Sequence, residues 1–209
     1  MSGNVDPEMM LRMANSLTDL VGVCKLETTV QSSSSRPVEE REVFELQCIC
    51  NEMMLSASLR SQIFSIFEKS MKAQYEQNWG WKEAEMRKEV FHPMSRYLCF
   101  YPEGNTEELA GYAIFRFEWD DDEEPEFPVL YCYQLMVSDE KQRHGLGKQL
   151  MNMLSIIGKK LRMEKIMLTV FNSNTDAVEF YKRVDFAIDQ NSPSTCGFPA
   201  DYEIMSKIP

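Results

Sequence analysis

The segment that most constrains this chain is an apolar stretch, residues 131–137, followed by a polar turn and the loop Gln142-Arg-His-Gly-Leu-Gly147. After the loop, apolar residues recur at the spacing of an amphipathic helix. A strand that passes through a glycine-containing loop into a helix leaves backbone N–H groups unpaired at the positive helix end. Such a loop can hold a pyrophosphate. The segment predicts a phosphate-bearing cofactor, with coenzyme A as the first candidate.

Two common phosphate-binding motifs do not fit this loop. It lacks the third glycine of a dinucleotide fingerprint and the Gly-Lys-Ser/Thr of a P-loop. A lone Gly-x-Gly is a weak signal, and a simple helix-starting turn explains it about equally well. The preceding strand and the following helix favour phosphate binding. Arg143 and Lys148 either add charge for phosphates or are solvated surface groups, and we expect His144 to be a surface group.

The size and charge of the chain limit its class. Its 209 residues predict an N-terminal helix and linker over 1–40 and one domain over 41–209. The net charge of −11, without a basic stripe, argues against nucleic-acid binding and favours a basic partner. The sequence contains no run of 18 or more apolar residues, so we expect no membrane-spanning helix. The first residues also lack the pattern of a secretory signal.

The cysteines predict reduced thiols. None of the six forms a CxxC pair, and only two histidines are present, so we expect no metal site. Cys48 and Cys132 lie in apolar runs and are expected to be core thiols. These features favour a reducing compartment, the cytoplasm, the nucleus or both.

Apolar periodicity predicts an α/β fold, in detail an α+β arrangement around a mixed sheet. The expected helices are 7–24, 58–78, 82–91, 145–162 and 175–184. The expected strands are 43–49, 95–101, 109–119, 127–137, 165–171, 186–189 and 201–207. A serine-rich linker is expected over 32–37.

Two motifs resemble the GNAT superfamily of N-acetyltransferases. Gln142, Gly145 and Gly147 match its (Arg/Gln)-x-x-Gly-x-(Gly/Ala) motif. Its Asn-x-x-Ala-x-x-(Leu/Phe)-Tyr helix is matched by Asn174, Ala177, Phe180 and Tyr181. The resemblance implies the GNAT acyl-CoA fold with an N-terminal helical extension, acetyl-CoA as cofactor and Tyr181 as an acid toward the departing thiolate. An ordinary packing role for Tyr181 is equally open. Asp185 replaces the usual turn glycine.

From Val43 onward the chain is similar to NatD-type histone N-alpha-acetyltransferases. The aromatic block Tyr75-Glu-Gln-Asn-Trp-Gly-Trp-Lys82 and the strand Val129-Leu-Tyr-Cys-Tyr133 are the most specific matches. Residues 165–171, 192–194 and 202–204 add to it. The resemblance implies acetylation of the N-terminal serine of histone four and of the 2A class, whose tails start Ser-Gly-Arg-Gly.

The candidate site residues fall into two groups. Candidate substrate contacts are Tyr75, Trp79, Glu118, Trp119, Asp120, Tyr131, Tyr133, Thr169, Asn191 (a serine in the family) and Tyr202. Candidate acetyl-CoA contacts are Leu135, Met136, Val137, Arg143, His144, Gly145, Leu146, Gly147, Lys148 and Asn174. Trp79 and Trp81 are more often packing residues than recognition residues.

The candidate catalytic residues are Gln134, Tyr133, Glu118, Asp120 and Tyr181. Gln134 occupies the position of the family's catalytic glutamate, and glutamine cannot take up a proton. An α-amine has a pKa of about 7.7–8.0, so Glu118 or Asp120 could deprotonate it directly or through water. Residues 120–124 are otherwise a solvated acidic loop. The carboxylates could also pair with a basic side chain of the substrate.

Together these features predict direct acetyl transfer, with the cofactor between strands 127–137 and 165–171. Backbone N–H groups of 135–137 would polarise the thioester. Cys132 is not expected to be a nucleophile, because no adjacent histidine lowers its pKa. Two alternatives stay open: a lysine or small-amine acetyltransferase, and a non-catalytic binder of acetyl-CoA and histone tails. We expect a monomer whose partners are histone tails and, during synthesis, the ribosome.

Overall fold

The computed structural model describes residues 6–32, 41–121 and 126–209, which group into two compact units. One unit, called the loop unit here, consists of Asp19–Phe115 and Gln134–Met153. The other, called the tyrosine unit, consists of Met1–Thr18, Arg116–Tyr133 and Leu154–Pro209. Strands β4 (Gly111–Trp119) and β5 (Pro128–Val137) and helix α5 (Leu146–Lys160) each contribute residues to both units.

The loop unit is built on antiparallel strands in the order β1, β2, β3, β4. β1 (Thr29–Gln31) pairs with β2 (Val43–Ile49), which pairs with β3 (Arg96–Pro102). The pair β3–β4 aligns Leu98 with Ala113. Most side chains of β3 and of this part of β4 are buried, which explains their nearly continuous apolar sequence.

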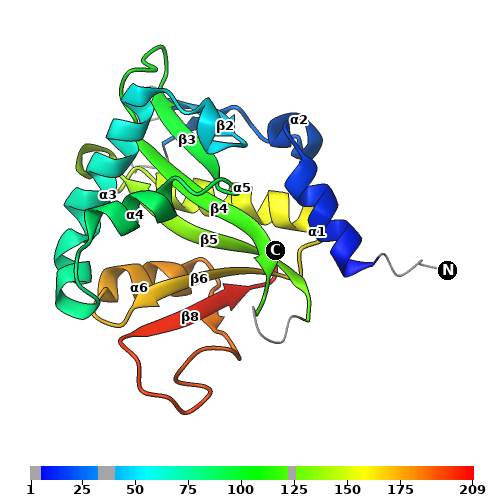
Figure 1. Cartoon of the computed structure of the whole chain (residues 1–209). Coiled ribbons are helices and arrows are strands. Elements are labelled where there is room, and N and C mark those ends of the chain that lie inside the picture. Colours follow the sequence, from blue (N-terminus) through cyan, green and yellow to red (C-terminus); the bar gives the residue numbers. More distant parts are fainter. Residues whose placement is uncertain (1–5, 33–40, 122–125) are drawn as a thin grey trace. The chain divides into compact units, whose positions relative to one another are not determined.

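Two helices of the loop unit, α3 (Ala57–Asn78) and α4 (Glu83–Val90), lie side by side (Figure 1). Ser56 caps α3 by accepting a hydrogen bond from the backbone N–H of Leu59. Ile63, Phe64 and Phe67 form its buried face. The hydroxyl of Tyr112 on β4 lies 3.1 Å from the carbonyl of Ile63, which ties α3 to the sheet. Short segments α2 (Leu20–Cys24) and the 3-10 turns η2 (Glu52–Met54) and η3 (Asp139–Lys141) complete this unit.

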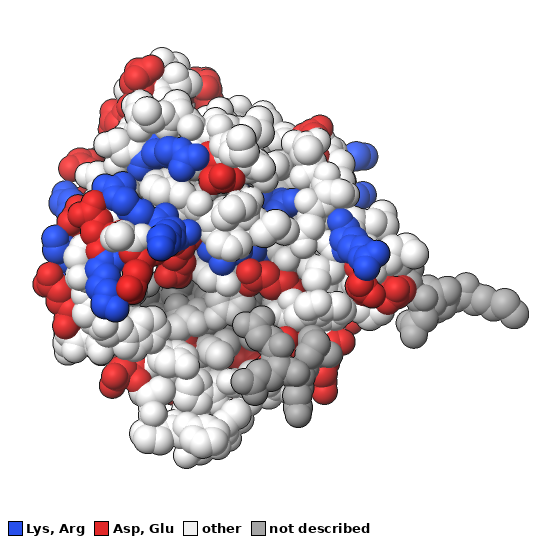
Figure 2. Space-filling model, viewed as in Figure 1, with Lys and Arg blue, Asp and Glu red and all other residues white. Residues whose placement is uncertain are grey.

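The exposed side of α3 and α4 carries ion pairs between neighbouring turns. Lys72 lies 2.8 Å from Glu68, and Arg87 lies 2.7 Å from Glu83. Figure 2 shows lysine, arginine and acidic residues intermixed over these helices. This face therefore carries no large field of one sign, which distinguishes it from a nucleic-acid-binding surface.

The tyrosine unit contains the one parallel strand pair of the described residues. β5 and β6 (Lys165–Phe171) run parallel, with Val129 opposite Lys165 and Tyr131 opposite Met167. β8 (Tyr202–Lys207) pairs antiparallel with β6 and with β7 (Ala187–Ile188). α6 (Thr175–Arg183) follows β6, and α1 (Pro7–Ser16) is held by a 3.1 Å bond from Asn15 Nδ2 to the carbonyl of Phe117. The predicted α/β fold with a mixed sheet is confirmed.

The N-terminal helix differs from the prediction. Instead of one helix over 7–24, α1 ends at Ser16 and α2 begins at Leu20. Leu17 is extended, and Asp19 caps α2 by accepting from the N–H of Gly22 at 2.8 Å. Capping by aspartate therefore overrides the continuous apolar spacing. β1 and the two 3-10 turns were not predicted.

The remaining helices and strands occur close to their predicted bounds. The expected linker at 33–37, the first five residues and residues 122–124 of the acidic loop lie outside the described residues. Among the helices that the structure describes, none has the length and apolar character needed to cross a membrane.

Candidate functional site

The loop before α5 adopts the shape expected of an anion-binding loop. Arg143 and Gly145 have positive φ angles of 65° and 82°, and α5 begins at Leu146. The backbone N–H of Gln149 donates to the carbonyl of Gly145 at 3.1 Å. Because helical bonding starts there, the N–H groups of residues 146–148 belong to the open first turn of a 15-residue helix. These donors and the helix dipole fit the phosphates of a coenzyme.

The ends of this loop are fixed within the loop unit. Lys69 on α3 lies 2.6 Å from Asp139, and Lys141 lies 3.0 Å from Glu42. The side-chain amide of Gln142 donates to Asp139 Oδ1 at 3.2 Å. His144 is not the surface group that we expected, since its side chain is only 17% exposed and Nδ1 lies 4.0 Å from Glu42 Oε2. Anchoring on both sides preorganises the loop.

Two cationic side chains lie in the loop or directly after it and form no ion pair with other described residues. Arg143 and Lys148 are both exposed, and neither forms an ion pair within the described residues. Leu146 is instead buried, as its position on the core face of α5 requires. The two exposed cations are therefore available to phosphate groups, while Leu146 holds the helix start in place.

Gln134 lies in the buried part of β5. Its side chain is 6% exposed, and its Oε1 lies 3.0 Å from the hydroxyl of Tyr112. Leu135, Met136 and Val137 follow it and are half-buried. A Cβ at Gly111 on β4 would lie 2.9 Å from the carbonyl of Met136, so a side chain there would push β4 away. The fixed Tyr112 hydroxyl holds the Gln134 amide in one orientation.

An aromatic group lies at the end of α3 in the loop unit. The Tyr75 ring contacts Trp79 and Trp81 edge-on, each at 6.0 Å between centroids, and burial raises the pKa of Tyr75. Trp81 also packs on Phe67 at 5.5 Å, which supports the packing interpretation for this tryptophan. Trp79 is 51% exposed and is thus the tryptophan that a ligand can reach.

The tyrosine unit brings two of the predicted polar residues, Tyr133 and Glu118, together with one that was missed, Arg116. The Tyr133 hydroxyl donates to Glu118 Oε2 at 2.8 Å. The guanidinium of Arg116 lies 3.8 Å from the centroid of the Tyr133 ring and 3.8 Å from Glu118 Oε1. Arg116 did not emerge from the sequence, although its i, i+2 spacing from Glu118 places both on one strand face. Burial, followed by the charge of Glu118, raises the pKa of Tyr133.

Tyr131 extends this group toward β6. Its hydroxyl lies 2.6 Å from Thr169 Oγ1, and its ring centroid lies 5.0 Å from that of Tyr133. Burial raises the pKa of Tyr131 to about 12, so both tyrosines are protonated near neutral pH. Cys132, between them, is buried, as alternation on the strand requires. The predicted shared face of Tyr131 and Tyr133 is thereby confirmed.

Several candidates also have structural roles. Asp120 Oδ1 accepts from the backbone N–H groups of Glu126 and Phe127 at 2.9 and 3.0 Å, and so closes the loop between β4 and β5. Asn174 caps α6 by accepting from the N–H of Ala177 at 3.3 Å. The N–H of Asn191 donates to Asp189 Oδ1 at 2.9 Å. Any contact of these three residues with a ligand would therefore use their other polar atoms.

The remaining candidates lie in the same unit. Trp119 ends β4, and Tyr202, at the start of β8, is paired with Phe171. Trp119 and Tyr202 are half-buried. Tyr181 on α6 packs its ring against Phe180 and Phe186 at 5.3 and 5.7 Å. Burial raises its pKa far above the ordinary value. Tyr181 therefore keeps its proton at any physiological pH.

The cysteines agree with the sequence expectation. All six are free thiols, with Cys132 buried and Cys48 half-buried. In the described part of the chain, no group of three or more histidine, cysteine or acidic residues could hold a metal ion.

Comparisons with known proteins identify a family and support the fold. Residues 60–186 match the family model described as the acetyltransferase (GNAT) family. The structure of Arabidopsis thaliana Naa50 in complex with the bisubstrate analogue CoA-Ac-MVNAL is 18% identical, with a TM-score of 0.52 over 78% of this chain and 97% of that chain.

Two further structures resemble the chain to a similar degree. Arabidopsis thaliana NAA60 in complex with acetyl-CoA is 16% identical, with a TM-score of 0.56 over 79% of this chain and 98% of that chain. The PaiA N-acetyltransferase of Thermoplasma acidophilum in complex with coenzyme A is 15% identical, with a TM-score of 0.55 over 79% and 99%. At these identities the likeness concerns the fold.

Proposed function

Because the chain belongs to the acetyltransferase (GNAT) family, we propose that it uses acetyl-CoA to acetylate the N-terminal serine amine of histone tails that start Ser-Gly-Arg-Gly. The observation that carries the proposal is the group formed by Glu118, Tyr133 and Arg116, which offers a carboxylate held by a tyrosine hydroxyl. The NatD-like aromatic block around Tyr75 supports the choice of a protein N-terminus over other amines.

The loop unit would bind the cofactor. Acetyl-CoA supplies an acetyl group activated as a thioester. The N–H groups of residues 146–148 and the exposed cations Arg143 and Lys148 would hold its phosphates. Backbone N–H groups of Leu135 to Val137 would orient and polarise the carbonyl. Asn174, which belongs to the tyrosine unit, retains an amide N–H₂ after its Oδ1 caps α6, and we propose this amide as a further donor to acetyl-CoA because its position matches a family cofactor contact.

The tyrosine unit would receive the amine. Glu118 accepts the ammonium proton directly or through a water molecule, since an α-amine of pKa about 7.7–8.0 needs little assistance. Tyr133 donates to the same carboxylate and so fixes its orientation. Asp120 is a weaker candidate for the base, because its Oδ1 already closes the loop between β4 and β5.

Tyr181 is the candidate for the acid, as the resemblance to the family implies. Burial among Phe180 and Phe186 raises its pKa, which keeps it protonated but makes it a weaker acid, so it would donate only to the strongly basic departing thiolate. The reaction then forms the N–C bond and breaks the C–S bond. The nitrogen loses two protons: Glu118 takes the first from the ammonium group, and the second, released as the amide forms, replaces the proton that Tyr181 gives to sulfur. No covalent enzyme intermediate is involved.

Charge supports a histone tail as the partner. The net charge of −11 attracts a basic chain, and Glu118 can pair with the arginine at the third position of the tail. We propose the nucleus and cytoplasm as the sites of action, a monomer as the active form, and the ribosome as a partner during synthesis.

The test is a mass-spectrometric assay with acetyl-CoA and a Ser-Gly-Arg-Gly-Lys peptide, alongside a copy with a blocked N-terminus. Acetylation of the free peptide at its terminus alone is the expected result. Acetylation of the blocked copy on lysine would instead establish a lysine acetyltransferase. A small free amine is assayed in parallel. Acetylation of this amine, with neither peptide acetylated, would establish a small-amine acetyltransferase.

Gln134 favours a second candidate, a binder without catalysis. Its amide is buried, hydrogen-bonded to Tyr112 and unable to accept a proton at neutral pH. If Glu118 does not act as base, the chain would bind acetyl-CoA and the histone tail without turnover. Binding of both ligands by calorimetry, with no product from either peptide, would select this function.

A further inference from the structure

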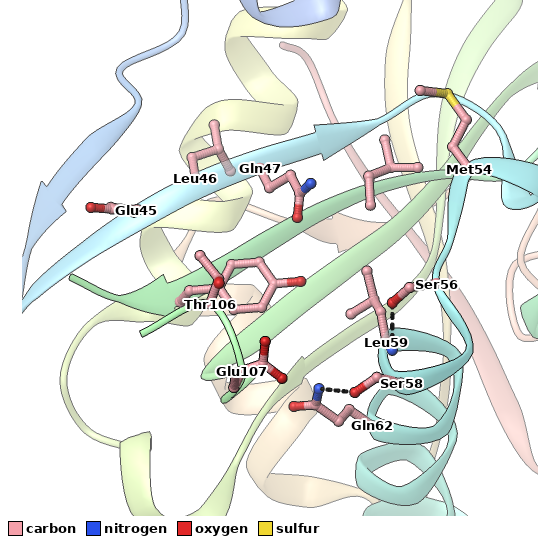
Figure 3. A pocket seen from close by; sticks show the side chains of 12 residues that line it. Glu45, Leu46, Gln47, Met54, Ser56, Ser58, Leu59, Gln62, Thr106 and Glu107 are labelled. Carbon is pink, nitrogen blue, oxygen red and sulfur yellow. Dashed lines mark hydrogen bonds between the residues drawn. The ribbon is translucent and has the colours of Figure 1, made fainter. Parts of the chain in front are cut away.

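A cavity of about 500 Å³ lies within the loop unit, and none of the residues that line it is a candidate of the acetyl-transfer site. It is bounded by β2, by the first turns of α3 and by the loop between β3 and β4. Figure 3 shows that Gln47 projects into it from β2 and Glu107 from the loop, with Leu59 of α3 on a third side. Its volume is in the range of small-ligand pockets.

One wall of the cavity carries a tyrosine hydroxyl that has no hydrogen-bond partner in the residues that the structure describes. Tyr101 is 4% exposed as a whole residue and lines the cavity. Tyr101 is paired directly with Glu45, so both side chains project from one face of the sheet. The hydroxyl is therefore available to a ligand in the cavity.

The other polar groups of the cavity are acceptors or neutral. Glu45 and Glu107 contribute two carboxylates, and neither forms an ion pair within the described ranges. The amide of Gln47 and the hydroxyl of Thr106 add two uncharged partners, also without side-chain bonds in those ranges. The lining includes no lysine, arginine or histidine. This charge pattern excludes an anion and favours a cation.

The shape of the cavity favours an organic cation over a metal ion. No cluster of metal-ligating side chains occurs in the part of the chain that the structure describes. The walls include apolar side chains, buried Leu59 and Ile49 and the 69% exposed Met54 at the rim. An ammonium group has three donors for the carboxylates and hydroxyls, and an alkyl chain would cover the apolar wall.

We propose that this cavity is a second binding site, for a primary alkylammonium group, formed by Tyr101, Gln47, Glu45 and Glu107. The group can come from a free diamine or from a lysine side chain of a partner protein. The site does not depend on the acetyl-transfer reaction, because none of its residues is a candidate for that reaction.

The test uses the full chain labelled with ¹³C at the methionine methyl groups, with Met54 as the reporter at the rim. Its signal is assigned by its loss in Met54→Leu. The probes, without acetyl-CoA, are 1,5-diaminopentane and Nα-acetyl-lysine N-methylamide, with 1,5-pentanediol as the uncharged control. We expect a saturable shift of the Met54 signal with at least one amine and none with the diol.

Variants decide whether the cavity is responsible. Glu45→Gln with Glu107→Gln is expected to weaken binding at least tenfold, and Tyr101→Phe severalfold. Glu103→Gln, which removes a charge from the same loop outside the cavity lining, is the matched control and should leave binding unchanged. A shift with both amines supports a free-amine ligand, and one with the lysine derivative alone supports a protein partner. No saturable shift, or equal binding by the double variant and the control, would overturn the proposal.

Discussion

The Tyr133 hydroxyl donates a 2.8 Å hydrogen bond to Oε2 of Glu118, one strand away from it in the same unit. The carboxylate that we propose as the base is thereby fixed by a phenol whose own pKa is raised. The other oxygen of this carboxylate, Oε1, lies 3.8 Å from the guanidinium of Arg116. Orientation of this kind is the main contribution that a protein makes to a proton transfer.

Replacing Tyr133 by phenylalanine removes this orientation. A hydrogen bond to a charged group contributes about 1.5–3 kcal/mol, so we expect kcat/KM for the Ser-Gly-Arg-Gly-Lys peptide to fall about tenfold or more. Tyr131→Phe, which loses the bond to Thr169 but leaves Glu118 untouched, is the control and should have a smaller effect. Equal losses in the two variants would show that Tyr133 acts through packing alone.

Gln134→Glu tests whether the native base belongs at this position. The Tyr112 hydroxyl, 3.0 Å from Gln134 Oε1, can donate to a carboxylate as it does to the amide, so the variant should fold. We expect turnover to increase about tenfold or more and the pH–rate profile to gain a limb on its acid side, where the rate rises with pH as the new carboxylate loses its proton. An unchanged profile would place the base elsewhere and leave Glu118 as the candidate. Tyr112→Phe in the same background measures how far the hydroxyl positions the side chain.

Asn174 has two roles that substitution can separate. Asn174→Ala loses the cap of α6 and should destabilise the protein by about 1 kcal/mol, measured by urea unfolding. Asn174→Asp keeps an oxygen for the N–H of Ala177 but loses the amide N–H₂ that we propose as a donor to acetyl-CoA, and it adds a negative charge. The aspartate variant should therefore retain stability and show a raised KM for acetyl-CoA. A normal KM would limit Asn174 to capping.

Periodicity located most helices and strands because their apolar faces repeat over many residues. It missed the break between Ser16 and Leu20, where the cap made by Asp19 competes with continuous apolar spacing. It also missed β1, since three residues carry too little pattern to identify a strand. In the candidate site, the glycine motif predicted a loop that leads into α5, and strand alternation predicted the shared face of Tyr131 and Tyr133. Arg116 stayed hidden, because a buried cation on a strand is recognised only through the ring and carboxylate beside it.

Cys50 should react as a thiolate at neutral pH. A hydrogen bond from the Cys48 thiol, which outweighs the opposing effect of burial, lowers its pKa to about 6. The thiolate is the form that reacts with iodoacetamide, and it predominates above the pKa of the thiol. Alkylation of Cys50 should therefore rise as the pH passes through about 6 and then level off. Burial instead raises the pKa of Cys99 to about 12, so this thiol should stay unmodified.

Pulse alkylation between pH 5 and pH 9 with peptide mass spectrometry measures each cysteine separately. Cys48→Ala removes the donor and should move the midpoint for Cys50 upward. A midpoint for Cys50 near the ordinary thiol value in the unaltered protein would contradict the assigned role of Cys48.

Glu118 and Asp120 can be distinguished by their effect on the third residue of the substrate. Asp120 Oδ1 is held by the N–H groups of Glu126 and Phe127, whereas Glu118 contacts the side chains of Tyr133 and Arg116. Glu118→Gln keeps the shape and removes the charge. It should lower kcat for both peptides, because it removes the proposed base. It should also raise the KM for a peptide with arginine at the third position severalfold more than for one with citrulline there, because only the charged side chain loses a partner. Asp120→Asn is the matched control and should affect both peptides alike. A reversed pattern would assign the arginine contact to Asp120, and equal losses for both peptides in both variants would remove charge pairing from the account of specificity.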